Sequence, residues 1–232
     1  MKLVSVLFGQ SIRIMKVISS IGGLYMPEAV KAVQEKYGFL QGPTTLQEFD
    51  SSKGVTFLHG TFAPPKPRLP KGKGQNRIVI DRFQIYTNGV LVETKGFTED
   101  ADQFLDDVTQ WAMEEFGITI HPNIPIRKAY LTNLEVEFPG AELPNFPLQK
   151  TLEGFLIGYG QTPSQFSTAG LTFHCDLTHV QPPLPTAFQI IRREGVPYSS
   201  NLYYSTAPLS TQDHLLLLED LDKQVFKKTP KK

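Results

Sequence analysis

RIVIDRFQIYTNGVLVETKG, residues 77–96, and FTEDADQFLDDVTQWAMEEFG, residues 97–117, decide the fold of this chain. The Asn88-Gly89 pair separates two β-rich runs, and both residues tolerate the positive φ of a type I′ turn, so the first segment predicts a β-hairpin. A turn at this pair places Ile85 opposite Val92. One face of the hairpin is then apolar and the other polar, as in an antiparallel sheet with one packed side. The apolar face carries Phe83, Ile85, Val90 and Val92.

The second segment predicts a helix that covers this hairpin. Thr98 suits the N-cap position, acidic residues follow it at the positive end of the helix dipole, and Gly117 closes the helix. The apolar residues recur at helical spacing and form one stripe. They are Ala101, Phe104, Leu105, Val108, Trp111 and Ala112. We expect the acidic side chains of the helix to face solvent.

The composition is that of an ordinary globular chain, with 232 residues, 40% hydrophobic and 20% charged. This length allows one large domain or two small ones. Lys plus Arg and Asp plus Glu number 23 each, so no overall field attracts nucleic acid or an anionic membrane. No apolar run approaches the ~18 residues of a transmembrane helix, and we expect no membrane partner. The single cysteine, Cys175, favours a reducing compartment, so we expect a cytoplasmic protein.

The order of the predicted elements repeats along the chain. Each half contains a strand, a helix, a second strand, a hairpin and a capped helix, the helix caps being Thr98 and Ser210. Short words recur at equivalent places. Val55-Thr56-Phe57 matches Leu171-Thr172-Phe173, and Phe83-Gln84-Ile85 matches Phe188-Gln189-Ile190. Such words also recur by chance in α+β proteins, but words and order together predict a duplication.

We therefore predict an α+β fold in which antiparallel sheets are covered by helices and a strand–hairpin–helix unit is duplicated. The two halves would span residues 1–117 and 127–232, or together form one compact pseudo-symmetric domain. At the start of the chain, residues 2–8 and 11–18 predict two strands joined near Gly9-Gln10. Residues 148–159 predict a helix, although two glycines weaken it.

A basic loop precedes the hairpin. Residues 63–76, APPKPRLPKGKGQN, contain four prolines and two glycines and predict an extended segment. Its bases could neutralise the phosphates of a nucleic acid or contact another anionic partner. They are Lys66, Arg68, Lys71 and Lys73, with Arg77 directly after them, and Arg192 and Arg193 could extend the patch. A solvated linker is the simpler interpretation, because no aromatic side chain lies among these bases to stack on nucleotides.

The sequence His174-Cys175-Asp176-Leu177-Thr178-His179 is the other candidate site. We predict a strand over residues 171–180, which places His174 and Asp176 on one face, close enough for a metal site or an acid–base pair. No metal-binding or catalytic motif of established spacing supports this site. Ordinary polar residues of a strand are the alternative interpretation.

The absence of a catalytic signature favours a non-enzymatic binding or assembly protein. It would use the basic loop and exposed sheet faces or edges, since an unclosed sheet can pair with another chain. We expect a protein partner or self-association and no cofactor. The first alternative is a nucleic-acid-binding protein that uses the basic loop. The second is a hydrolase or metal-dependent enzyme centred on His174 and Asp176.

Overall fold

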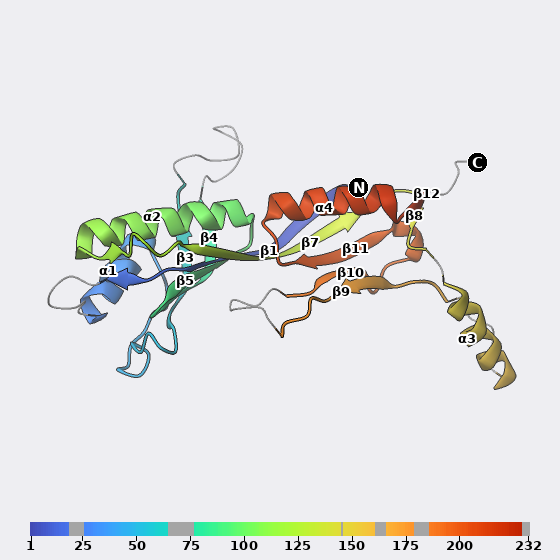
Figure 1. Cartoon of the computed structure of the whole chain (residues 1–232), viewed down its shortest axis with the longest axis horizontal. Helices are drawn as coiled ribbons and strands as arrows, with labels where there is room; N and C mark the ends of the chain where they lie inside the picture. Colours follow the sequence, from blue (N-terminus) through green and yellow to red (C-terminus); the bar gives the residue numbers. More distant parts are fainter. Residues whose placement is uncertain (19–25, 65–76, 145, 161–165, 179–185, 229–232) are drawn as a thin grey trace.

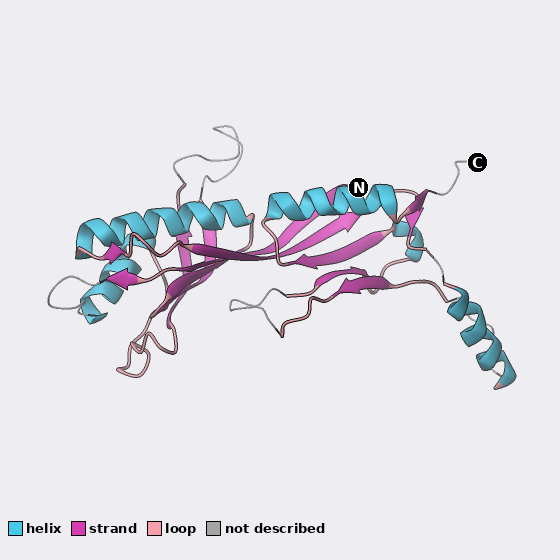
Figure 2. Ribbon diagram, viewed as in Figure 1, coloured by secondary structure: helices cyan, strands magenta, loops and turns pink. Residues whose placement is uncertain are grey.

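The computed structural model describes residues 1–18, 26–64, 77–144, 146–160, 166–178 and 186–228. In this part of the chain an eight-stranded antiparallel sheet is the central feature, and two helices lie end to end along it (Figures 1 and 2). The strands in spatial order are β3 (Val55–Phe62), β4 (Ile78–Tyr86), β5 (Gly89–Thr94), β1 (Lys2–Ile14), β7 (Arg127–Glu137), β11 (Leu202–Ala207), β10 (Phe188–Arg192) and β9 (Gly170–Phe173). The helices are α1 (Met26–Tyr37), α2 (Thr98–Phe116), α3 (Pro147–Gly158) and α4 (Thr211–Gln224).

Two short ladders flank the sheet. The strands β2 (Val17–Ile18) and β6 (Thr119–Ile120) pair at one end, and β8 (Ala141–Glu142) pairs with β12 (Lys227–Lys228) at the other. A 3-10 turn, η1 (Tyr198–Ser200), connects β10 to β11.

The strand order confirms the α+β fold and the duplicated unit. From one edge the strands run β3-β4-β5-β1, and from the other they run β9-β10-β11-β7. The repeated words occupy equivalent positions. Gln84 donates to Thr56 Oγ1 at 2.9 Å, and Gln189 donates to Thr172 Oγ1 at 3.4 Å. The stacked pairs Phe57–Phe83 and Phe173–Phe188 both have ring centroids 5.8 Å apart.

The two long helices meet at their N-termini through a reciprocal contact. The Thr98 amide donates to Thr211 Oγ1 at 2.9 Å, and the Thr211 amide donates to Thr98 Oγ1 at 2.8 Å. Thr98 is therefore the first residue of α2 and not its cap, and Thr211 is its counterpart in α4. The cap at Ser210 is confirmed, since its Oγ accepts from the Asp213 amide at 3.1 Å.

The hairpin β4–β5 forms with a register that differs from the prediction. Ile85 lies opposite Val90 instead of Val92, because the turn is at Thr87 and Asn88. Gly89 is the first residue of β5 and lies opposite Ile14 of β1. A Cβ at Gly89 would lie 2.3 Å from the Arg13 carbonyl oxygen. The shift of two residues leaves the predicted apolar face intact, since side chains alternate with a period of two.

A single strand, β1, replaces the two predicted at the start of the chain. Gly9 does not form a turn, and it lies where β1 is paired on both sides, opposite Thr94 of β5 and Thr132 of β7. An added Cβ there would lie 2.3 Å from the Gly96 carbonyl oxygen. This glycine therefore permits a close backbone approach within a strand.

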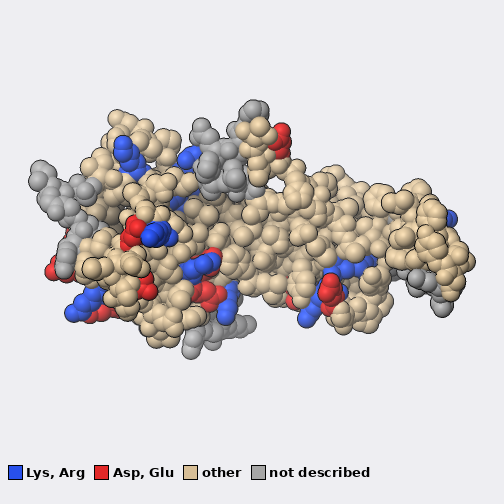
Figure 3. All heavy atoms as spheres, turned by 90° about the horizontal axis from the view of Figure 1, so that it is seen from below, with Lys and Arg blue, Asp and Glu red and all other residues tan. Residues whose placement is uncertain are grey.

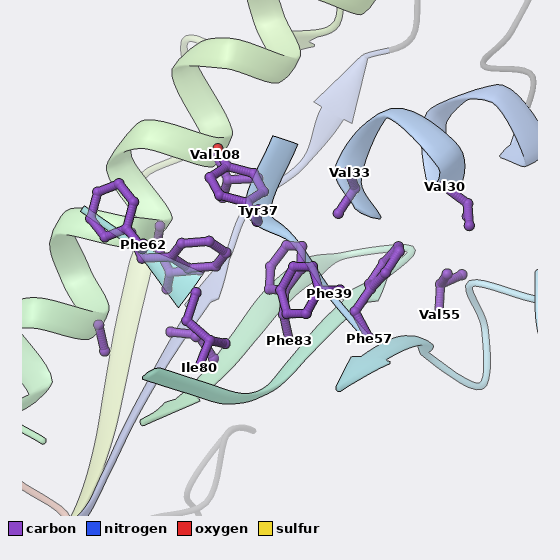
Figure 4. Packing of buried hydrophobic residues seen from close by; sticks show 14 residues of the cluster. Val30, Val33, Tyr37, Phe39, Val55, Phe57, Phe62, Ile80, Phe83 and Val108 are labelled. Atoms are coloured by element: carbon purple, nitrogen blue, oxygen red, sulfur yellow. The ribbon is translucent and has the colours of Figure 1, made fainter. Parts of the chain in front are cut away.

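The side of the sheet covered by α2 carries an aromatic core in the N-terminal half (Figure 4). Phe83 is at its centre, with ring centroids 5.1 Å from Phe104, 5.8 Å from Phe57 and 6.1 Å from Phe39. Tyr37 of α1 closes it against Phe104 at 4.9 Å. A second buried cluster lies under α4 in the C-terminal half. The start of β1 packs against that second cluster, and the division of the chain into residues 1–117 and 127–232 stays a prediction.

Part of the acidic side of α2 faces the sheet, contrary to the expectation of a solvated face. Arg13 of β1 is 4% exposed, and its guanidinium contacts Asp106 at 2.5 Å and Asp102 at 3.5 Å. Burial acts to raise the pKa of Asp102, but hydrogen bonds from Ser11 and Tyr130 and nearby cations outweigh it and lower the pKa. These contacts fasten α2 to the middle of the sheet.

His214 of α4 is buried in the C-terminal half without a charged partner. Its ring nitrogens lie 2.6 Å from Thr132 Oγ1 and 2.8 Å from Ser205 Oγ, and the ring of Phe188 packs against it edge-on. Burial lowers the pKa of His214 to about 4. Because the unfolded chain binds the proton more readily, the histidine makes the free energy of unfolding fall as the pH drops from about 6.5 towards 4.

We expect the free energy of unfolding to fall by about 2 kcal/mol through His214 between pH 7 and pH 5. A His214→Gln variant should have a shallower pH dependence in this range, whatever its stability at pH 7. Urea denaturation at several pH values measures both slopes. Identical slopes would show that His214 is not held neutral.

Candidate interaction surface

Of the seven basic residues suggested as one patch, Arg77, Arg192 and Arg193 lie in the described part of the chain, in different halves of the molecule. Lys66, Arg68, Lys71 and Lys73 lie outside the described residues, and Arg77 is exposed directly before β4. Arg192 and Arg193 belong to the far half of the sheet, beyond β1 and β7. A role in partner binding for these seven residues stays a prediction.

Arg192 and Arg193 both have partners within the chain. Arg192 is 6% exposed, and its Nη1 donates to the Tyr198 carbonyl at 2.9 Å. Its guanidinium also lies over the ring of Tyr198 at 4.6 Å. Arg193 forms an ion pair with Glu135 of β7. Both guanidinium groups are therefore engaged by neighbouring residues of the same chain.

The predicted strand over residues 171–180 ends at Phe173, because β10 begins at Phe188, which lies opposite Phe173. His174 and Asp176 follow in exposed irregular chain and do not share a strand face. Asp176 accepts from the Thr178 hydroxyl and amide, which hold the pKa of its carboxyl below the usual value. Within the described ranges no group of three or more His, Cys, Asp or Glu could hold a metal. The enzyme alternative gains no support from this geometry.

The face of the sheet opposite α2 and α4 pairs its cations with carboxylates. Glu93 of β5 is 7% exposed and accepts from Arg82 Nε at 2.7 Å and from Gln10 at 2.8 Å. Farther along, Lys2 contacts Glu137 at 3.3 Å. On the side of the molecule away from α2 and α4, charges of both signs gather over the N-terminal half, and the middle is largely uncharged (Figure 3). The described charges on this side of the molecule therefore do not form a surface patch of a single sign.

The helix α3 projects from the end of the molecule, and none of its residues is buried (Figure 1). Four of its apolar side chains recur at intervals of four, three and four residues and lie along one side of the helix. We call them the α3 stripe, and their exposed fractions are 74% for Leu148, 42% for Leu152, 60% for Phe155 and 75% for Tyr159. Exposed apolar side chains that form a contiguous group mark interaction sites, whereas scattered ones do not.

Hydrogen bonds hold α3 to the chain that flanks it. The Phe166 amide donates to Glu153 at 2.8 Å, and Gln149 donates to Thr168 Oγ1 at 3.2 Å. Thr168 in turn donates to the Pro144 carbonyl at 2.6 Å. The segment that follows α3 is thus hydrogen-bonded both to the helix and to the segment that precedes it. These bonds fix the position of the projecting helix.

A second exposed apolar group lies beside α4, on the sheet side that α4 covers. Phe173 of β9 is 58% exposed and stacks on the partly buried Phe188, which contacts His214 of α4. Leu217 of α4 is 38% exposed. We call this group the C-terminal patch, and its members are Leu171, Phe173, Phe188 and Leu217.

A cavity of about 380 Å³ lies between α1, α2 and the β4–β5 hairpin. Its walls are mainly apolar, with Met26 and Val30 from α1, Trp111 from α2 and Ile85 from β4 among them. The lining residues that the structure describes include no charged side chain, so the cavity suits an apolar group. Residues 19–25, between β2 and α1 in the sequence, lie outside the described residues.

The sequence predicts the helix that carries the α3 stripe but does not indicate that the stripe is exposed. A helix was predicted over residues 148–159, and the structure confirms one over Pro147–Gly158. The signal was present as apolar residues at helical spacing. Such a stripe ordinarily indicates a buried face, and only the structure shows that nothing in the described chain covers it.

No protein-family model and no curated protein matches this chain. Among solved structures, Methanococcus jannaschii TBP is similar at 17% sequence identity and a TM-score of 0.39, over 95% of this chain and 98% of that chain. Similarity at this level carries no argument about the function of this chain. In the part of the chain that the structure describes, no helix has the length and apolar character to cross a membrane.

Proposed function

We propose that this chain is a non-enzymatic binding or assembly protein that associates with another protein chain through exposed apolar side chains, chiefly the α3 stripe. The observation that carries the proposal is a projecting helix with its whole apolar side exposed. Burying a large apolar side chain contributes about 1.5–3 kcal/mol. Four such residues supply a gross gain of about 6–12 kcal/mol, which is of the same order as the entropic cost of association.

The mode of binding follows from the shape of the stripe. An amphipathic helix that presents anchors at i, i+4, i+7 and i+11 suits an apolar groove or sheet face on its partner. We therefore propose a protein partner, and the reducing cytoplasm as the place of association, in keeping with the single cysteine.

Nucleic-acid binding remains the second hypothesis from the sequence, through Lys66, Arg68, Lys71, Lys73 and Arg77. The charges around the sheet favour it less, because Arg82 and Arg193 are engaged with Glu93 and Glu135. Binding to phosphates requires cations that are free to replace counterions.

Affinity purification from the native cell tests the proposed function, with a tagged wild type compared with Phe155→Asp and Ile157→Asp. Ile157 is 52% exposed and lies on the opposite side of α3, so it is a matched control. We expect the wild type and Ile157→Asp to retain the same protein chain, which can be an untagged copy of this protein, and Phe155→Asp to lose about tenfold of it or more.

Equal retention by all three proteins would contradict the proposal. Retention that disappears with nuclease, or that falls steeply with salt, would instead support the nucleic-acid hypothesis.

A further inference from the structure

The helices α1 and α3 carry the same apolar stripe at the same place in the repeat. Each follows the central strand of its half, β1 or β7, and precedes the edge strand, β3 or β9. The α1 stripe is Met26, Val30, Val33 and Tyr37, and adding 122 to each number yields Leu148, Leu152, Phe155 and Tyr159. Both stripes end in Tyr-Gly, and both glycines have a positive φ, 60° at Gly38 and 77° at Gly160. The two helices are equivalent members of the duplication.

In the N-terminal half the α1 stripe is buried. Val30, Val33 and Tyr37 are only 3–4% exposed, and they cover Phe57 of β3 and Phe104 of α2, which are completely buried. Figure 4 shows these side chains of α1 facing the aromatic cluster on the sheet. The N-terminal half therefore shows that such a stripe packs on the edge strand of the sheet and on the neighbouring long helix.

The C-terminal half has the corresponding surface without its helix. Phe173 occupies the position of Phe57, because each pairs with the first phenylalanine of the repeated Phe-Gln-Ile. Leu217 follows Thr211 by six residues, as Phe104 follows Thr98. Both counterparts are exposed where the originals are buried. The C-terminal patch is thus the surface that α1 covers in the other half.

The structure holds α3 away from that patch in its own chain. The hydrogen bonds of Glu153, Gln149 and Thr168 tie the helix to its flanking segments at the end of the molecule. A stripe and its complementary surface are therefore both exposed on one chain and not in contact. This arrangement is self-complementary, and it closes as a dimer when two copies form both contacts about a two-fold axis.

We propose that two copies of this chain form a reciprocal dimer in which α3 of each copy covers the C-terminal patch of the other. The α3 stripe then packs on Phe173 and Leu217 as the α1 stripe packs on Phe57 and Phe104. This inference rests on the proposed function and identifies its partner as a second copy of the chain. The contact corresponding to Tyr37–Phe104, whose ring centroids are 4.9 Å apart, is Tyr159 of one copy against Leu217 of the other.

Cross-linking of mixed cysteine variants tests this contact. In a Cys175→Ser background, one protein carries Tyr159→Cys and the other Leu217→Cys, and the mixture is treated with a short bismaleimide. We expect a two-chain product that neither protein forms alone. Replacing the second protein by Leu216→Cys, on the outer side of α4 and 54% exposed, should lower its yield by about tenfold or more. Circular dichroism checks that each variant is folded.

The variant carrying both Tyr159→Cys and Leu217→Cys separates the two arrangements of α3. We expect two-chain products from it, whereas a link within one chain would show that α3 covers its own patch and would overturn the dimer. Absence of the two-chain product from the mixture would overturn it as well. If a different protein is still retained through Phe155 in that case, the dimer fails and the proposed function stands. If nothing is retained, both fail.

Discussion

Phe57→Ala is expected to lower the free energy of unfolding by about 3–5 kcal/mol, whereas Phe173→Ala should change that of the single chain by less than about 1 kcal/mol. The two phenylalanines hold the same position in the repeat, and each stacks on its neighbour at 5.8 Å. They differ in what lies above them. Phe57 is completely buried beneath α1 and Phe39, while Phe173 is 58% exposed.

Urea denaturation at low protein concentration measures both effects, since dilution disfavours association and isolates the single chain. At high concentration Phe173→Ala should lose additional stability, because the proposed dimer covers this residue. A loss of 3 kcal/mol or more from Phe173→Ala in the dilute chain would mean that α3 covers its own patch. In that case both halves would have their edge-strand phenylalanine covered by a helix of the same chain.

Gly9→Ala is expected to cost about 1–3 kcal/mol of stability or more, although only one methyl group is added. Its Cβ would lie 2.3 Å from the Gly96 carbonyl oxygen and 3.2 Å from the Thr98 amide nitrogen. Both are backbone atoms at the start of α2, so no side chain can rotate away. Relief requires β1 and α2 to move apart, and the contacts of Arg13 with Asp102 and Asp106 oppose this movement.

Gly154→Ala is the matched control for Gly9→Ala. In the described ranges, no atom outside its own helix backbone and its chain neighbours lies within 4 Å of its added Cβ, and in a helix alanine is favoured over glycine by about 1 kcal/mol. This variant should therefore be as stable as the wild type or slightly more stable. Thermal and urea denaturation of both variants measure the difference. Equal stability of Gly9→Ala and the wild type would show that β1 does not pass α2 this closely.

Local patterns predicted most of the elements. Periodicity and turn chemistry indicated the β4–β5 hairpin, α2, α3 and the Ser210 cap, and the repeated words with the order of elements predicted the duplication. The errors came from glycines whose role depends on tertiary contacts. Gly9 and Gly89 suggested turns, but the structure uses both where another backbone passes within reach of a Cβ. Such contacts join residues far apart in sequence and leave no local signal.

The candidate site depends even more on tertiary structure. The strand β9 ends at Phe173, opposite the first residue of β10, so His174 and Asp176 do not share a strand face. The side chains of Arg192 and Arg193 are directed by contacts with Tyr198 and Glu135 that the sequence does not indicate. The spacing of the α3 stripe is visible in the sequence, but the role we propose for it depends on its exposure. The equivalent stripe of α1 is buried, so the exposure of the α3 stripe distinguishes the two copies of the unit.

We propose that this difference between the two halves, a covered surface in one and an uncovered surface in the other, allows the protein to associate. One unit is complete, with α1 over its edge strands, and the other presents both the helix and the surface it should cover. A duplicated fold can thus become an assembly protein by leaving one internal contact open, because the same apolar side chains then stabilise association instead of folding.

The molar mass of the purified chain in solution, measured by sedimentation equilibrium over a range of concentrations, tests this claim most directly. The chain has a mass of 26.0 kDa. We predict that the wild type and Ile157→Asp approach twice this mass as concentration rises, and that Phe155→Asp stays at the mass of one chain. A wild type that remains at 26.0 kDa throughout, or a Phe155→Asp variant that associates as the wild type does, would contradict it.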